Sequence, residues 1–118
     1  MTDSSTDGIK ILLIPVSDVE VATALYTALL GTAPQANSPY YVGFDANDQH
    51  IGLLPGGGPQ AMTSPVPHWR VSDIEAKLAE LTAAGATVKE APREVGGGRL
   101  VAAVTDLDGN VLGLFQDQ

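Results

Sequence analysis

The sequence predicts an α+β domain in which one strand–helix–three-strand unit occurs twice. The pentapeptide VSDVE at residues 16–20 returns as VSDIE at residues 71–75, which is 55 positions later. Each copy follows an apolar stretch and leads into a helix-like segment that ends at a glycine, and short strand-like runs come next. A chain of 118 residues has room for one modest core, so we expect the two units to pair within a single domain.

The first unit opens with the apolar stretch Ile9–Val16, which predicts a strand. Asp18 then stands at a helix N-cap position, where its carboxylate can accept amide hydrogen bonds of the first helical turn. The helix is expected to end before Gly31. Runs at Tyr40–Phe44 and Ile51–Leu54, separated by a polar turn, predict two strands after it. The apolar stripe expected to pack this helix comprises Val21, Leu25 and Leu29, flanked by Ala22 and Tyr26.

The second unit repeats this plan, with a strand at Val66–Val71 and an N-cap at Asp73. Its helix is expected to end before Gly85. An Asp-Gly pair at residues 108–109 predicts a hairpin turn. The packing stripe of this helix comprises Ile74, Leu78 and Leu81, and the strands that follow are predicted at Thr87–Glu90, Leu100–Thr105 and Val111–Phe115.

The domain organisation follows from these elements and from the distribution of glycine and proline. Residues 1–8 are expected to form a disordered tail, and residues 9–118 a single domain. Within it, residues 9–56 make the first module, the Gly- and Pro-rich residues 57–64 a linker, and residues 65–118 the second module.

Charge and composition exclude several classes of partner. Six basic and 14 acidic residues give a net charge of -8, which repels nucleic acid and favours a neutral or cationic ligand. No apolar run approaches the ~20 residues of a membrane-spanning helix, so no membrane partner is expected. The chain has no cysteine, and its first residues do not resemble a signal peptide, which predicts a cytoplasmic location.

The repeated units resemble the vicinal oxygen chelate superfamily, which includes glyoxalase I, bleomycin-resistance proteins and extradiol dioxygenases. The resemblance implies two βαβββ modules that form a half-open mixed-sheet barrel around one cavity, with the helices outside, and often a homodimer. One departure is Leu107, where the family usually has proline. The residues that carry the resemblance are 16–18, 25–26, 29–31, 51–53, 71–75, 84–86, 96–98 and 106–113.

The same resemblance implies four metal-ligand positions, and none of them holds a ligand in this sequence. They are occupied by Ile11, Gly52, Val66 and Gly113. Metal ions in proteins need carboxylate, imidazole or thiolate donors, which these four residues lack. The sequence therefore predicts no metal ion and no other cofactor.

Other side chains are candidates for contact with a small molecule. Strand alternation places His68 and Arg70 on the face of Val66, either as ligand contacts or as cover for a wet concave surface. Tyr41 and Phe115 are further candidates, as cavity-lining residues or as ordinary packing.

The remaining aromatic candidates are predicted to have structural roles. Trp69 has the opposite parity to His68 and is expected to pack under the second helix. His50 lies at the edge of a polar turn and is expected to be an exposed bystander.

Three functions are consistent with these observations. The first is a metal-free small-molecule-binding protein of the glyoxalase/bleomycin-resistance type, with a neutral or cationic organic ligand in the cavity between the modules. The alternative is a glyoxalase-like lyase or isomerase that uses His68 as its acid–base group, with Arg70 or Tyr41 holding an oxyanion. The third is a dimeric accessory module without chemistry of its own.

Overall fold

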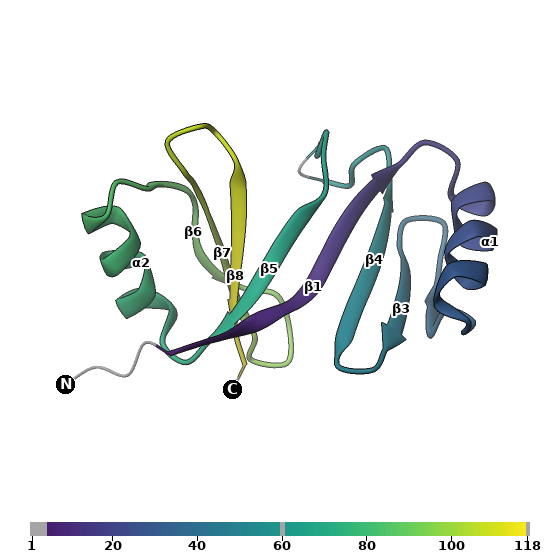
Figure 1. The fold of residues 1–118 in the computed structure, drawn as a ribbon, viewed down its shortest axis with the longest axis horizontal. Coiled ribbons are helices and arrows are strands. Elements are labelled where there is room, and N and C mark those ends of the chain that lie inside the picture. The colour runs from purple at the N-terminus through teal and green to yellow at the C-terminus, as the bar shows by residue number, and fades with distance from the viewer. Residues whose placement is uncertain (1–4, 60, 118) are drawn as a thin grey trace. The chain divides into compact units, whose positions relative to one another are not determined.

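The computed structural model describes residues 5–59 and 61–117, in which one helix and three strands follow a first strand, twice (Figure 1). The α+β class and the βαβββ repeat are thereby confirmed. The elements are β1 (Thr6–Val16), α1 (Val19–Leu30), β2 (Ala36–Asn37), β3 (Val42–Ala46), β4 (Gln49–Pro55), β5 (Val66–Val71), α2 (Ile74–Ala83), β6 (Thr87–Glu94), β7 (Leu100–Thr105) and β8 (Val111–Gln116).

The chain divides into two compact units. The first unit is Ile11–Val66, and the second unit is Pro67–Gln118 together with the N-terminal residues up to Lys10. The sheet order in the first unit is β1-β4-β3-β2, and in the second unit it is β5-β8-β7-β6. In each, the strand before the helix pairs in parallel with the last strand, and the other pairs are antiparallel. The duplicated sequence thus folds twice into the same strand order.

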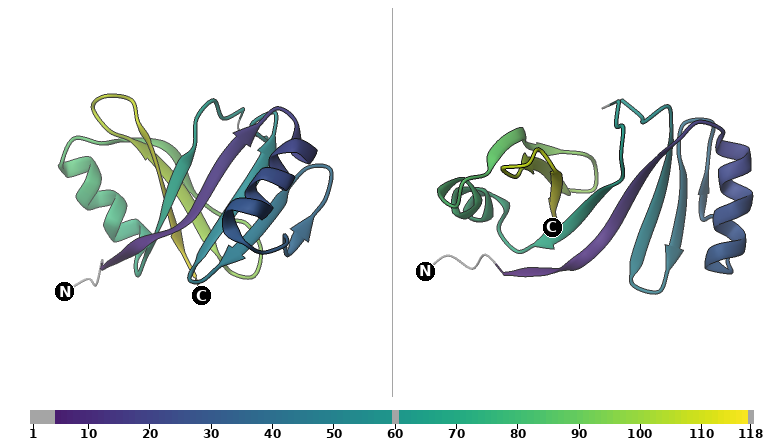
Figure 2. Two further views of the ribbon diagram at one scale, coloured as in Figure 1. Left: turned by 45° about the vertical axis from the view of Figure 1, so that its right-hand side comes forward. Right: turned by 45° about the horizontal axis from the view of Figure 1, so that its top comes forward.

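Helix α1 covers one face of the first unit's sheet (Figure 2). Asp18 caps it as predicted, because its Oδ1 accepts hydrogen bonds from the amides of Glu20 and Val21, both at 3.1 Å. Gly31 ends the helix with a φ of 70° and donates its amide to Thr27. The core under the helix is formed by Val42, Phe44 and Leu53, which are fully buried.

The predicted packing stripe of α1 is wrong at its three central residues, whereas the flanking Ala22 and Tyr26 do pack onto the sheet. Val21, Leu25 and Leu29 are 65%, 58% and 69% exposed. The reason is that α1 is apolar nearly all round, with Glu20 as its one charged residue, so periodicity alone did not distinguish two possible stripes. The residues that pack onto the sheet are Val19, Ala22, Tyr26 and Leu30.

Helix α2 covers one face of the second unit's sheet through the stripe that the sequence predicts. Ile74 and Leu78 are buried, and Leu81 packs against them. The Asp73 side chain accepts the Ala76 amide at 3.0 Å and caps the helix. Trp69 contacts this same core, which confirms its predicted packing role.

The N-terminal boundary differs from the predicted one. Residues 6–8, expected in a disordered tail, belong to β1, and residues 1–4 lie outside the described part of the chain. The Ser72 amide donates to the Ser5 carbonyl at 3.0 Å, so the start of β1 is held beside β5 in the second unit. In the described part of the chain, neither helix is long and apolar enough to cross a membrane.

Candidate functional site

Two side chains of the β3–β4 hairpin and Tyr41, directly before β3, form a connected hydrogen-bond chain. Asp45 lies directly opposite His50 in the antiparallel register. The His50 Nδ1 is 2.7 Å from the Asp45 Oδ1, and the His50 Nε2 is hydrogen-bonded to the Tyr41 hydroxyl. The Tyr41 and His50 rings are stacked, with centroids 5.9 Å apart and planes 12° from parallel. We call these three residues the relay.

Two facing glycines make room for the relay. Gly43 and Gly52 are paired across β3 and β4. A β-carbon on Gly43 would lie 2.8 Å from the His50 Cε1, and one on Gly52 would lie 2.5 Å from the Tyr41 oxygen and 2.8 Å from the Leu13 Cδ2. Side chains at these positions would displace the relay.

The relay lies on the sheet face away from α1. Val42 and Phe44, which alternate with Gly43 and Asp45 along β3, are buried in the core under the helix. Tyr41 therefore has the parity that the sequence predicts.

The exposed position predicted for His50 is wrong. Its side chain is 30% exposed, and both ring nitrogens have partners within the relay. The physical reason is the register, because a two-residue turn places Asp45 and His50 opposite each other on one face. An aspartate and a histidine flanking a tight turn at this spacing are the sequence signal that would have identified the pair.

In the second unit, His68 and Arg70 lie on the sheet face away from α2. Their neighbours Trp69 and Val71 belong to the core under that helix. His68 pairs in register with Gly113, and a β-carbon on Gly113 would lie 2.6 Å from the His68 Nε2. The imidazole therefore occupies the space above Gly113, as the Tyr41 hydroxyl occupies the space above Gly52 in the first unit.

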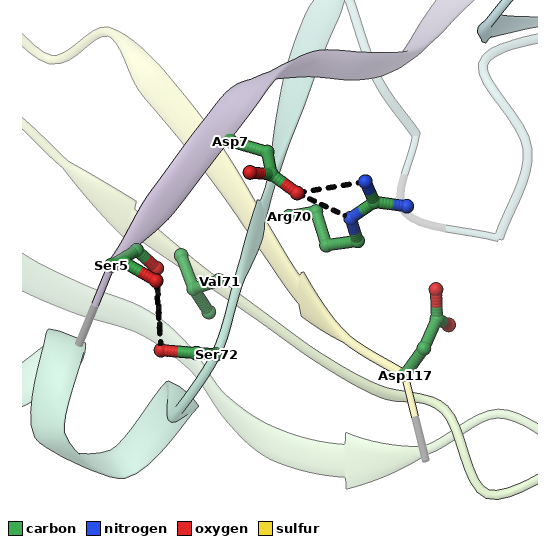
Figure 3. A pocket seen from close by; sticks show the side chains of 6 residues that line it. All are labelled: Ser5, Asp7, Arg70, Val71, Ser72 and Asp117. Atoms are coloured by element: carbon green, nitrogen blue, oxygen red, sulfur yellow. Dashed lines mark hydrogen bonds and ion pairs between the residues drawn. The ribbon is translucent and has the colours of Figure 1, made fainter. Parts of the chain in front are cut away.

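Arg70 forms an ion pair with Asp7. Its Nη2 and Nε lie 2.7 and 2.8 Å from the same Asp7 oxygen (Figure 3). The Arg70 side chain is 42% exposed, so this pair stabilises the fold only weakly. The pair borders an open pocket of about 210 Å³ lined by Ser5, Asp7, Arg70, Val71, Ser72 and Asp117.

Phe115 is nearly inaccessible, at 2% exposure. The Arg99 guanidinium lies 4.6 Å above the centre of its ring, and the Arg99 Nε donates to Asp117 at 2.6 Å. Contact between a ligand and this ring requires Arg99 to move, so the buried position fits the packing alternative.

Comparison with known proteins identifies the family. The model of the glyoxalase/bleomycin resistance protein/dioxygenase superfamily matches residues 8–114. The chain belongs to this superfamily. No curated protein matches this superfamily member.

Solved structures of the superfamily share its fold. The Mn(II)-bound glyoxalase from Novosphingobium aromaticivorans has a TM-score of 0.75 and 20% identity, over 97% of this chain and 40% of that one. The methylmalonyl-CoA epimerase from Mycobacterium tuberculosis has a TM-score of 0.72 and 19% identity, over 100% of this chain and 93% of that one. A superfamily member from Vibrio splendidus 12B01 has a TM-score of 0.72 and 17% identity, over 97% of this chain and 99% of that one.

The residues of this superfamily member do not fit the metal site that the family resemblance implies. Ile11 and Val66 carry aliphatic side chains. At Gly52 and Gly113 the space for a longer side chain is taken by Tyr41 and His68. Among residues 5–59 and 61–117, no group of three or more histidine, aspartate or glutamate side chains is placed to hold a metal ion.

Proposed function

We propose that this superfamily member binds a small organic molecule, neutral or cationic, without a metal ion. The observation that carries the proposal is the pair of glycines at Gly52 and Gly113, which are covered by the Tyr41 hydroxyl and the His68 imidazole. A phenol and an imidazole stand where the family resemblance implies metal-binding side chains. Both can hydrogen-bond a ligand directly.

The proposed ligand contacts are Tyr41, His68 and Arg70, with Phe115 reached only after movement of Arg99. Tyr41 and His68 lie in different units, and each is on the face away from its helix. In small-molecule sites a few polar groups orient the ligand, while apolar surface supplies much of the affinity. The net charge of -8 favours a ligand that is not an anion.

Native mass spectrometry and elemental analysis of the purified protein test the metal-free state. A stoichiometric divalent metal in the folded protein would contradict the proposal. A co-purified organic adduct would support it and would give the mass of the ligand.

Ligand binding itself is tested by a thermal-shift screen of neutral, cationic and anionic compounds. A compound that binds the folded state raises the melting temperature by mass action. Hits are then compared in Tyr41→Phe and His68→Gln, with Tyr40→Phe as the matched control, because Tyr40 is 82% exposed. A screen without any hit, or hits unaffected by both site variants, counts against the proposal.

The second candidate function is isomerase or lyase chemistry with His68 as the acid–base group. The supporting observation is the seat of the His68 ring over Gly113 on the face away from α2. The fold is also that of methylmalonyl-CoA epimerases, although the likeness at 19% identity concerns the fold alone. Activity that survives His68→Ala would remove this candidate.

The homodimer and the cytoplasmic location remain predictions within this proposal. The molar mass in solution, measured by light scattering across a range of protein concentrations, tests the dimer. Fractionation of cells that produce the protein tests the location.

A further inference from the structure

We propose that the relay of Asp45, His50 and Tyr41 presents the Tyr41 oxygen as a hydrogen-bond acceptor for a protonated amine. The inference rests on the proposed small-molecule binding and names the chemical class of the ligand.

With a neutral His50 ring, the two hydrogen bonds determine which atoms of the relay carry protons. An ionised carboxylate only accepts, so the Asp45 Oδ1 accepts from Nδ1–H of His50 at 2.7 Å. In the neutral imidazole, the other nitrogen is then an acceptor, and the Tyr41 hydroxyl donates to Nε2. The Asp45 carboxylate therefore selects the Nδ1–H tautomer of His50.

This pattern makes the Tyr41 oxygen an acceptor toward a ligand. A phenol that donates its proton retains lone pairs on the oxygen. Hydrogen bonds in a chain polarise one another, so the negative charge of Asp45 raises the electron density at the Tyr41 oxygen. The complementary group is a strong donor, and an ammonium N–H is stronger than a neutral one.

The charge of the first unit favours a cation. Residues 11–66 contain no lysine and no arginine, and their four carboxylates belong to Asp18, Glu20, Asp45 and Asp48. All six basic side chains of the protein therefore lie outside this segment. An anionic ligand at Tyr41 would face the Asp45 carboxylate with no lysine or arginine of the same unit to offset it.

The stacked rings add a second element of recognition. The Tyr41 and His50 rings lie within 12° of parallel, with their centroids 5.9 Å apart. A cation over the face of a tyrosine ring is attracted by its π electrons. An amine that carries an apolar group would combine this attraction with a hydrogen bond to the oxygen.

The first test is the tautomer of His50, measured by long-range proton–nitrogen NMR of the histidine rings. The protein has two histidines, so His68→Gln assigns the His50 signals directly. We expect an Nδ1–H ring in the wild type and loss of this preference in Asp45→Asn. An Nε2–H ring in the wild type would overturn the inference.

The second test is titration with benzylammonium, benzyltrimethylammonium and phenylacetate, monitored at the His50 ring and at the backbone amides. Benzylammonium is expected to shift the His50 signals saturably. Benzyltrimethylammonium keeps the charge but has no N–H, and it is expected to bind about tenfold more weakly, as is benzylammonium to Tyr41→Phe. Phenylacetate is expected to leave the His50 signals unchanged.

Tyr40→Phe serves as the matched control and is expected to bind benzylammonium like the wild type, because Tyr40 is 82% exposed. Equal affinity of Tyr41→Phe and wild type would overturn the inference, as would equal affinity for the two ammonium compounds. Far-ultraviolet circular dichroism verifies that each variant is folded, and Asp45→Asn probes the relay from its other end. If other compounds bind in the thermal-shift screen while benzylammonium leaves His50 unchanged, this inference fails and the proposed function stands.

Discussion

The His68 imidazole lies over Gly113, close enough that a β-carbon on residue 113 would be 2.6 Å from the ring's Nε2. The two residues are also paired in register on β5 and β8. We therefore expect Gly113→Ala to destabilise the protein by about 1–3 kcal/mol, because the added methyl group displaces the His68 ring. Urea unfolding monitored by Trp69 fluorescence measures this cost.

Two further variants distinguish a clash with the His68 ring from the general effect of replacing a strand glycine by alanine. The double variant Gly113→Ala/His68→Ala is expected to recover part of the loss, since the clashing ring is gone. Gly8→Ala is the matched control, because a β-carbon there would meet nothing within 4 Å. Additive costs in the double variant would contradict the assigned contact.

Leu25 and Leu78 allow the same substitution to be compared in the two helices. Leu78 is a buried residue of α2, so Leu78→Ala is expected to cost about 2–5 kcal/mol of unfolding free energy. Leu25 is 58% exposed on α1, so Leu25→Ala is expected to change stability by less than about 0.5 kcal/mol. Chemical denaturation measures both, and equal costs would show that the Leu25 face is covered in solution.

Asp106 makes stability depend on acid pH. Hydrogen bonds from the side chain and the backbone amide of Asn110 hold the pKa of Asp106 below its ordinary value of 3.8. The stabilisation is therefore fully present above pH 3.8 and is lost as the pH falls through the lowered folded-state pKa. We expect Asp106→Asn to unfold with a shallower dependence on pH in this range, as followed by urea unfolding at a series of acidic pH values. An unchanged dependence would contradict the assignment.

Removal of divalent metals is expected to leave the melting temperature unchanged, because Ile11, Gly52, Val66 and Gly113 offer no donor side chain. Thermal unfolding before and after dialysis against a chelator tests this. A lowered melting temperature that zinc or manganese restores would reveal a metal site built from other residues.

Much of the fold could be predicted from the sequence, because the duplicated caps are local signals. Asp18 and Asp73 cap the two helices as expected, and the predicted stripe of α2, with Ile74 and Leu78, packs in the core. The packing face of α1 could not be predicted from local signals. Its apolar residues surround the whole helix, so only contact with the sheet distinguishes the Tyr26 face from the Leu25 face.

The candidate site was harder to predict, since it depends on register and on side-chain reach. Strand parity correctly placed Tyr41 and His68 away from the helices. The hydrogen bonds of His50 with Asp45 and Tyr41 were not predicted, because a histidine at the edge of a polar turn usually points to water. Only the register of β3 against β4 shows that its neighbour across the hairpin is a carboxylate.

Strand β1 begins among the residues of the second unit and ends among those of the first. A cut in the connection between the two repeats would therefore not release two complete pieces. The C-terminal piece would lose the segment around Ser5 and Asp7 that lies beside β5, and the N-terminal piece would keep it without a partner. The first residues of the chain therefore complete the second unit, so a protein cut between the repeats is expected to need both pieces to form these contacts.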